Sequence, residues 1–82
     1  MNLPAAPTRV DWFRILDDLK REGYGLRDIT HFTGIPRSTL LTYRAGSEPG
    51  YSTGQKLVMF WAQATSRDAA SVPMVNPYSY RA

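Results

Sequence analysis

The stretch that decides the fold of this chain reads Leu26-Arg27-Asp28-Ile29-Thr30-His31-Phe32-Thr33-Gly34-Ile35-Pro36-Arg37-Ser38-Thr39-Leu40-Leu41-Thr42-Tyr43-Arg44-Ala45-Gly46. Gly34 interrupts it, and because glycine adopts a left-handed backbone at no steric cost, we expect a tight turn there. Pro36 fits the first turn of a helix, where its missing N–H is not needed. Gly46 marks the end of that helix. We therefore predict two short helices, over residues 26–33 and 36–44, that meet at this turn.

The apolar residues of this stretch have the spacing that two crossing helices need. Ile29 lies near the middle of the first helix, and Thr30 follows it where the second helix crosses over. Ile35 comes directly after the turn and is expected to fill the core. Leu40 and Tyr43 lie one turn apart and anchor the inner face of the second helix. Two short helices joined by a glycine-containing turn form a helix-turn-helix motif.

Helices are also predicted on both sides of the motif. The first is expected to start between Thr8 and Asp11, with Thr8 as N-cap and Asp11 at capping-box spacing, and to end at Gly23. Its apolar face repeats at helical spacing: Trp12, Ile15, Leu16 and Leu19. The last helix is expected to begin near Ser52 or Thr53. It has a wide apolar face: Leu57, Val58, Phe60, Trp61 and Ala64.

Together these elements predict a single all-α fold. We expect a small four-helix domain over residues 8–66 that contains the helix-turn-helix. No segment alternates with period two for long enough to predict a strand. Residues 1–7 contain two prolines and are expected to form a flexible N-terminal arm. Residues 67–82 lack periodicity and are expected to form a flexible C-terminal tail, which is a candidate dimerisation arm.

The composition excludes several classes of protein. There is no cysteine and one histidine, His31, which excludes disulfides, thiolate sites and an ordinary zinc site. Asp17 and Asp18 are adjacent, so on a helix their carboxylates point about 100° apart and do not form a catalytic pair. No glycine-rich phosphate loop is present. We therefore expect no enzymatic activity, no cofactor, no metal and no small-molecule ligand.

The ends and the hydropathy of the chain bear on its location. No apolar run approaches the roughly 18 residues of a membrane span. The N-terminus lacks the basic start and the apolar stretch of a signal peptide. We expect a cytoplasmic protein without a membrane partner, and one that stands alone without a separate ligand-sensing domain.

The positive charge is concentrated in the middle of the chain. The formal net charge is +3. Residues 1–25 carry four basic and four acidic side chains, whereas residues 26–56 carry four basic and two acidic ones. A local excess of Lys and Arg is the electrostatic footprint of nucleic-acid binding. The excess coincides with the predicted helix-turn-helix.

Residues 28–43 resemble the helix-turn-helix of phage repressors, Cro-like proteins and bacterial regulators. The run Gly-Ile-Pro-Arg-Ser-Thr-Leu over residues 34–40 is also similar to a motif in some transposase and pipsqueak-type DNA-binding domains. Thr30 departs from the alanine or glycine usual at its position, which is expected to widen the helix crossing slightly. The resemblance implies a transcriptional repressor or autorepressor in a bacterial or phage-infected cell, associated with the nucleoid. It would insert its third helix into the major groove of a palindromic operator in double-stranded DNA, as a homodimer.

The same resemblance implies roles for exposed residues in and around the third helix. Base contacts are expected from Arg37, Ser38, Leu41 and Thr42, with the arginine donating to guanine O6 and N7. Phosphate contacts are expected from the flanks: Arg27, Thr39, Arg44, Tyr51, Ser52 and Lys56. Two interpretations of Leu41 stay open, because an exposed leucine suits either a thymine methyl group or a packing partner.

The dimer surface and a second function are also predicted at this point. The last helix has more apolar residues than one small core needs, so dimerisation is assigned to Val58 and Trp61 with Tyr78 and Tyr80 of the tail. The alternative function is a helix-turn-helix docking or assembly module, such as a small terminase-type DNA-packaging component, or a protein-binding adaptor. In that case Leu41 and the tail aromatics would meet protein.

Overall fold

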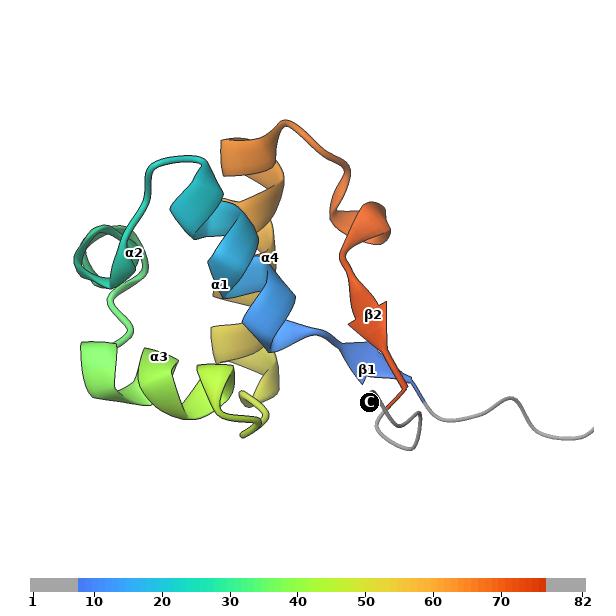
Figure 1. The fold of residues 1–82 in the computed structure, drawn as a ribbon, viewed down its shortest axis with the longest axis horizontal. Coiled ribbons are helices and arrows are strands. Elements are labelled where there is room, and N and C mark those ends of the chain that lie inside the picture. Colours follow the sequence, from blue (N-terminus) through green and yellow to red (C-terminus); the bar gives the residue numbers. More distant parts are fainter. Residues whose placement is uncertain (1–7, 77–82) are drawn as a thin grey trace, which may run out of the picture.

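Four helices make up most of the structure, a computed structural model that describes residues 8–76 (Figure 1). Their bounds are α1 (Trp12–Arg21), α2 (Leu26–Thr33), α3 (Arg37–Arg44) and α4 (Tyr51–Thr65). The prediction of a small all-α domain with four helices is confirmed. α1 packs against α4, and α2 and α3 lie together at one side of this pair. Residues 1–7, expected as an arm, lie outside the described residues.

The helix-turn-helix segment follows the predicted bounds closely. Gly34 ends α2 with a left-handed φ of 78°, and its amide donates to the carbonyl of Thr30 at 2.8 Å. The hydroxyl of Thr33 accepts from the amide of Ile35 at 3.2 Å, which leads the chain out of the turn. Pro36 is the N-cap of α3, so the helix starts at Arg37, one residue after the predicted start. Local turn chemistry therefore places α3 as the sequence predicted.

The start of α1 differs from the prediction. Asp11, not Thr8, is the N-cap, and its carboxylate accepts from the amide of Arg14 at 3.1 Å. The preceding residues form a strand, β1 (Arg9–Val10), which pairs in antiparallel register with β2 (Met74–Val75). The Thr8 cap was wrong because backbone pairing with the far end of the chain holds these residues extended.

Residues 67–76 likewise do not behave as the tail that the sequence predicted. They contain a 3₁₀ turn, η1 (Ala69–Ser71), followed by β2. Val72 packs against the core, and the carbonyl of Pro73 accepts from the amide of Asp11 at 2.8 Å. The segment therefore packs against the domain and holds the start of α1 through backbone hydrogen bonds.

α4 (Tyr51–Thr65) starts near the predicted position, but its predicted cap was wrong. The helix begins at Tyr51 with Gly50 as N-cap and no side-chain cap, so the expected Ser52 cap does not form. Gly54 lies where α4 approaches α1 closely, and a Cβ there would be 3.1 Å from Cη2 of Trp12. Ser66 ends the helix with a left-handed φ of 56°.

The core lies between the four helices. Its fully buried members come from all of them: Ile15, Leu19, Ile29, Leu40, Leu57 and Trp61. One carboxylate is buried with them, because Asp18 accepts from Nε1 of Trp61 at 3.0 Å and from Nε of Arg14 at 3.2 Å. A buried charge needs such partners to offset its lost hydration.

This packing corrects one residue of the predicted dimer surface, Trp61. Trp61 has 0% of its surface exposed, so it belongs to the core of its own chain and offers nothing to a partner. Val58 is half-buried and packs against the same core. Tyr78 and Tyr80 lie outside the described residues. The sequence assigned Trp61 to the dimer surface because it could not show that α1 packs against this side of α4.

Candidate nucleic-acid interface

α3 presents a face that takes no part in the core. Leu40 and Tyr43 point inward and are buried. At about 100° per residue, Ser38, Leu41 and Thr42 point the opposite way, and all three are exposed. Leu41, at 39% exposure, is the large apolar residue of this face. We call these three residues the free face of α3.

The two hydroxyls of the free face differ in their bonding. Thr42 Oγ1 donates to the carbonyl of Thr39 at 2.6 Å, so its proton is already committed to the helix backbone. Among the residues that the structure describes, the hydroxyl of Ser38 has no such partner. Ser38 can therefore donate or accept, whereas Thr42 can only accept.

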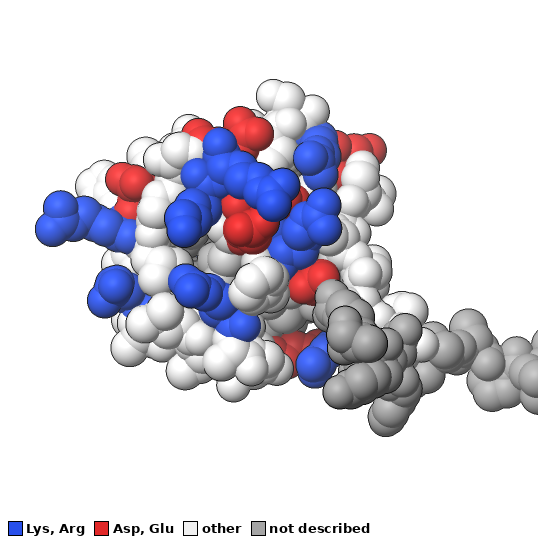
Figure 2. Space-filling view, viewed as in Figure 1, with Lys and Arg blue, Asp and Glu red and all other residues white. Residues whose placement is uncertain are grey.

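A groove of 600 Å³ lies beside α3, between it, α1 and α2. Four cationic side chains line it: Lys20, Arg27, Arg37 and Arg44. Its walls are apolar and include Phe13, Leu16 and Leu26. We call it the cationic groove. Figure 2 shows blue side chains spread over the face of the molecule that α1, α2 and α3 form.

The cations of this groove carry uncompensated charge. Elsewhere on the molecule arginines are paired with carboxylates at 3.1–3.8 Å: Arg9 with Glu48, Arg14 and Arg67 with Asp18, and Arg21 with Asp17. Within residues 8–76, five cations form no ion pair: Lys20, Arg27, Arg37, Arg44 and Lys56. Four of these five line the cationic groove. The groove's acidic lining residue, Asp17, is already paired with Arg21.

The structure thus brings some predicted site residues together and separates others. Arg27, Arg37 and Arg44 converge on one groove, and Lys20 joins them although the sequence assigned it no role. Tyr51, Ser52 and Lys56 lie on α4 instead, where Tyr51 is 82% exposed. Thr39 is half-buried. Lys20 was missed because its sequence position shows only the polar side of α1 and not which helices stand beside it.

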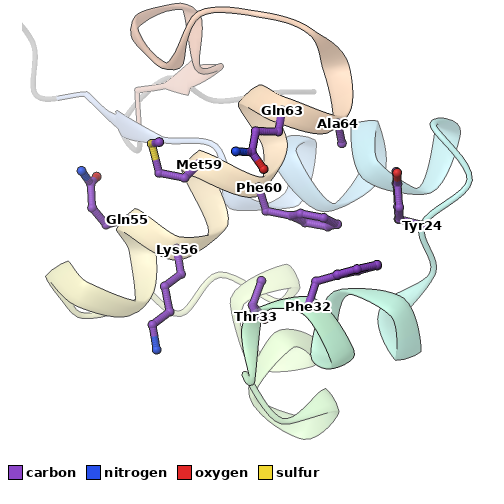
Figure 3. Close-up of a pocket in the computed structure, with 9 residues that line it drawn as sticks. All are labelled: Tyr24, Phe32, Thr33, Gln55, Lys56, Met59, Phe60, Gln63 and Ala64. Atoms are coloured by element: carbon purple, nitrogen blue, oxygen red, sulfur yellow. The ribbon is translucent and has the colours of Figure 1, made fainter.

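A second groove, of 740 Å³, lies between α2 and α4 and is mainly apolar (Figure 3). Its lining consists of Tyr24, Phe32, Thr33, Gln55, Lys56, Met59, Phe60, Gln63 and Ala64. The rings of Phe32 and Phe60 stack at 5.4 Å, and Tyr24 meets Phe60 edge-on at 5.1 Å. Phe32 nevertheless stays 61% exposed and Met59 49%. We call this the apolar groove, and the sequence analysis assigned no role to Phe32 or Met59.

No family model, no curated protein and no solved structure matches the chain. Within the described residues, no group of three or more His, Cys, Asp or Glu side chains could hold a metal ion. No helix of that part of the chain is long and apolar enough to cross a membrane.

Proposed function

We propose that this protein is a sequence-specific DNA-binding transcriptional regulator of the repressor type. It inserts α3 into the major groove of a palindromic operator and binds as a homodimer. The observation that carries the proposal is the free face of α3 lying directly beside four unpaired cations. A protein that binds a specific DNA sequence needs side chains that contact base edges and, beside them, side chains that contact phosphates.

The dimensions support this use of α3. An α-helix with its side chains is about 10–12 Å across, and the major groove of B-DNA is about 12 Å wide and admits it. Ser38, Leu41 and Thr42 then face the base edges. The cationic groove flanks them on one side and neutralises phosphates, which supplies most of the salt-dependent affinity.

The small size of this surface supports a homodimer on a palindrome. A single α3 reads only a few base pairs, whereas two copies related by a two-fold axis read two half-sites. Bound across a promoter, such a dimer would block polymerase. Its occupancy would follow the concentration of the protein.

The test is a selection of bound duplexes from random DNA with the full chain, followed by salt titrations. We expect a recovered palindrome and a steep loss of affinity with salt. Arg27→Gln should reduce the slope of log K against log salt by about 0.9, because one phosphate contact is lost. The matched control is Arg9→Gln, which removes a cation already paired with Glu48 outside the lining of the cationic groove and should leave the slope unchanged. Equal affinity for all duplexes contradicts the proposal.

The apolar groove favours a second candidate, a docking or assembly module. Exposed aromatic and methionine side chains around a groove mark surfaces that bind other proteins. Under this alternative, Phe32→Ser abolishes a protein complex, and the full chain gives no gel shift at low salt. Under the DNA-binding proposal, Phe32→Ser leaves the gel shift intact, because Phe32 lines the apolar groove and is not on the free face of α3.

A further inference from the structure

We infer that Arg37 holds the DNA backbone and does not read a base, and that the operator is read chiefly through a thymine methyl group at Leu41. This rests on the proposed function and refines it. Arg37 was among the base contacts predicted from the sequence. The structure places it in the cationic groove, and that changes which bases the protein recognises.

Arg37 and Arg44 lie on one stripe of α3. Seven residues correspond to about 700°, which is 20° short of two full turns, so both side chains leave the helix on the same side. Both line the cationic groove with Lys20 of α1 and Arg27 of α2. The free face lies to the side of this stripe.

A cluster of four cations suits the charged phosphate backbone of DNA and not the edge of a single base. A guanine offers one pair of acceptors, O6 and N7, which a single arginine fills. A phosphodiester strand carries one negative charge at every nucleotide, so several neighbouring cations can each bind a phosphate. Arginine also binds phosphate with two parallel hydrogen bonds, so Arg37 has suitable geometry for this role.

The free face that remains has no side chain for bidentate recognition. Arginine, lysine, asparagine and glutamine make the paired contacts to guanine or adenine, and Ser38, Leu41 and Thr42 are none of these. The Thr42 hydroxyl donates within the helix at 2.6 Å, so it can only accept from a base. Ser38 offers one hydroxyl, which suits several bases equally well.

Leu41 therefore supplies the main chemical preference of this face. It is 39% exposed and, at about 100° per residue, lies between Ser38 and the stripe of Arg37 and Arg44 around the helix. In the major groove, the apolar group that a base presents is the C5 methyl of thymine. The expected half-site has a required thymine opposite Leu41 and no required guanine opposite Arg37.

Uracil provides a clean test, since it differs from thymine only by that methyl group. In the selected operator, each thymine is replaced in turn by deoxyuridine. At one position per half-site, wild-type affinity should drop about fourfold, as expected for about 0.8 kcal/mol per buried methyl-sized group. Leu41→Ala should bind thymine and uracil operators equally, and Leu41→Met should keep the preference. A wild-type protein insensitive to every uracil overturns the assignment of Leu41.

Arg37 is tested with Arg37→Gln and with 7-deazaguanine, which lacks the N7 acceptor. We expect Arg37→Gln to weaken selected and random duplexes by the same factor and to lower the salt slope by about one. The 7-deazaguanine operators should bind as tightly as the unmodified ones. Loss of sequence preference in Arg37→Gln, or weaker binding to a 7-deazaguanine operator, overturns the assignment of Arg37. These results differ from a failure of the proposed function itself, in which no duplex is preferred at all.

Discussion

The cationic groove and the apolar groove lie on two sides of α2 and share Tyr24 as a lining residue. One gathers four cations without carboxylate partners, and the other gathers stacked aromatic rings with Lys56 as its charged lining residue. The composition of α2 does not explain the contrast, because the helix carries both Arg27 and Phe32. What differs is which neighbouring helix completes each groove. α1 and α3 bring cations, whereas α4 brings Met59 and Phe60.

Ion pairing differs between neighbouring cations of α1. Arg14 and Arg21 of α1 are close in sequence to Lys20, yet both are engaged by Asp18 and Asp17. Lys20 has no such partner within the described residues. An exposed ion pair contributes little to stability. It nevertheless lowers the positive electrostatic potential that the cation would otherwise present to an anionic partner. Pairing, more than the number of arginines, therefore decides where unpaired positive charge lies on the described domain.

The largest change in stability is expected from truncating the core residue of α2, the helix that both grooves share. Ile29 of α2 is 0% exposed, so Ile29→Ala should lower the free energy of unfolding by about 2–5 kcal/mol. Urea denaturation followed by circular dichroism measures this change. Phe32→Ala on the same helix is the control and should cost much less, because Phe32 is 61% exposed. Equal losses in the two variants would contradict the packing described for α2.

The next effect is a change in the salt dependence of DNA binding, which should respond to the cationic groove and not to the apolar groove. Replacing Lys20, Arg27, Arg37 and Arg44 together by glutamine should lower the salt slope of DNA binding by about three to four units, since each lost phosphate contact contributes about 0.9. The matched variant Phe32→Ser/Met59→Ser changes only the apolar groove and should leave the slope unchanged. Salt titrations of both variants with one duplex provide the measurement. A changed slope in the apolar-groove variant would show that the two surfaces are not independent.

A smaller effect is expected at the turn that sets α3 against α2. Gly34 has φ of 78°, and a side chain in this left-handed region costs about 1–2 kcal/mol. Gly34→Ala should therefore reduce stability by that amount, although no atom lies within 4 Å of the added Cβ. Gly34→Asn should lose less, because asparagine tolerates this backbone better. Thermal unfolding of the three proteins checks the order, and an alanine variant as stable as wild type would contradict it.

The smallest effect concerns a polar atom enclosed between the helices. Thr30 Oγ1 is buried without a hydrogen-bond partner. Thr30→Val replaces this hydroxyl by a methyl group of similar size and should raise the free energy of unfolding by about 1 kcal/mol. Thr33→Val is the contrasting variant, because Thr33 Oγ1 donates to the carbonyl of Ile29 at 2.7 Å and its loss should destabilise. Destabilisation by Thr30→Val would indicate that its hydroxyl has a partner after all.

Part of the candidate site was predictable from the sequence. Arg27, Arg37 and Arg44 lie in or beside a motif whose turn is marked by Gly34, so their neighbourhood could be inferred. The free face of α3 followed from helical periodicity once Leu40 and Tyr43 were assigned to the core. Lys20 and the aromatic stack of Phe32 on Phe60 could not be inferred, because they depend on helices that meet only after folding.

The sequence by itself determined the elements whose cause is local. α2, the turn at Gly34 and α3 follow from backbone freedom at one glycine, the missing N–H of Pro36 and apolar spacing over a few residues. Tertiary structure alone decided the pairing of Arg9–Val10 with Met74–Val75, the burial of Trp61 beside Asp18, and the gathering of four cations from three helices. These features join residues far apart in the chain. Their contacts exist only after the core has formed, so no short window of sequence contains them.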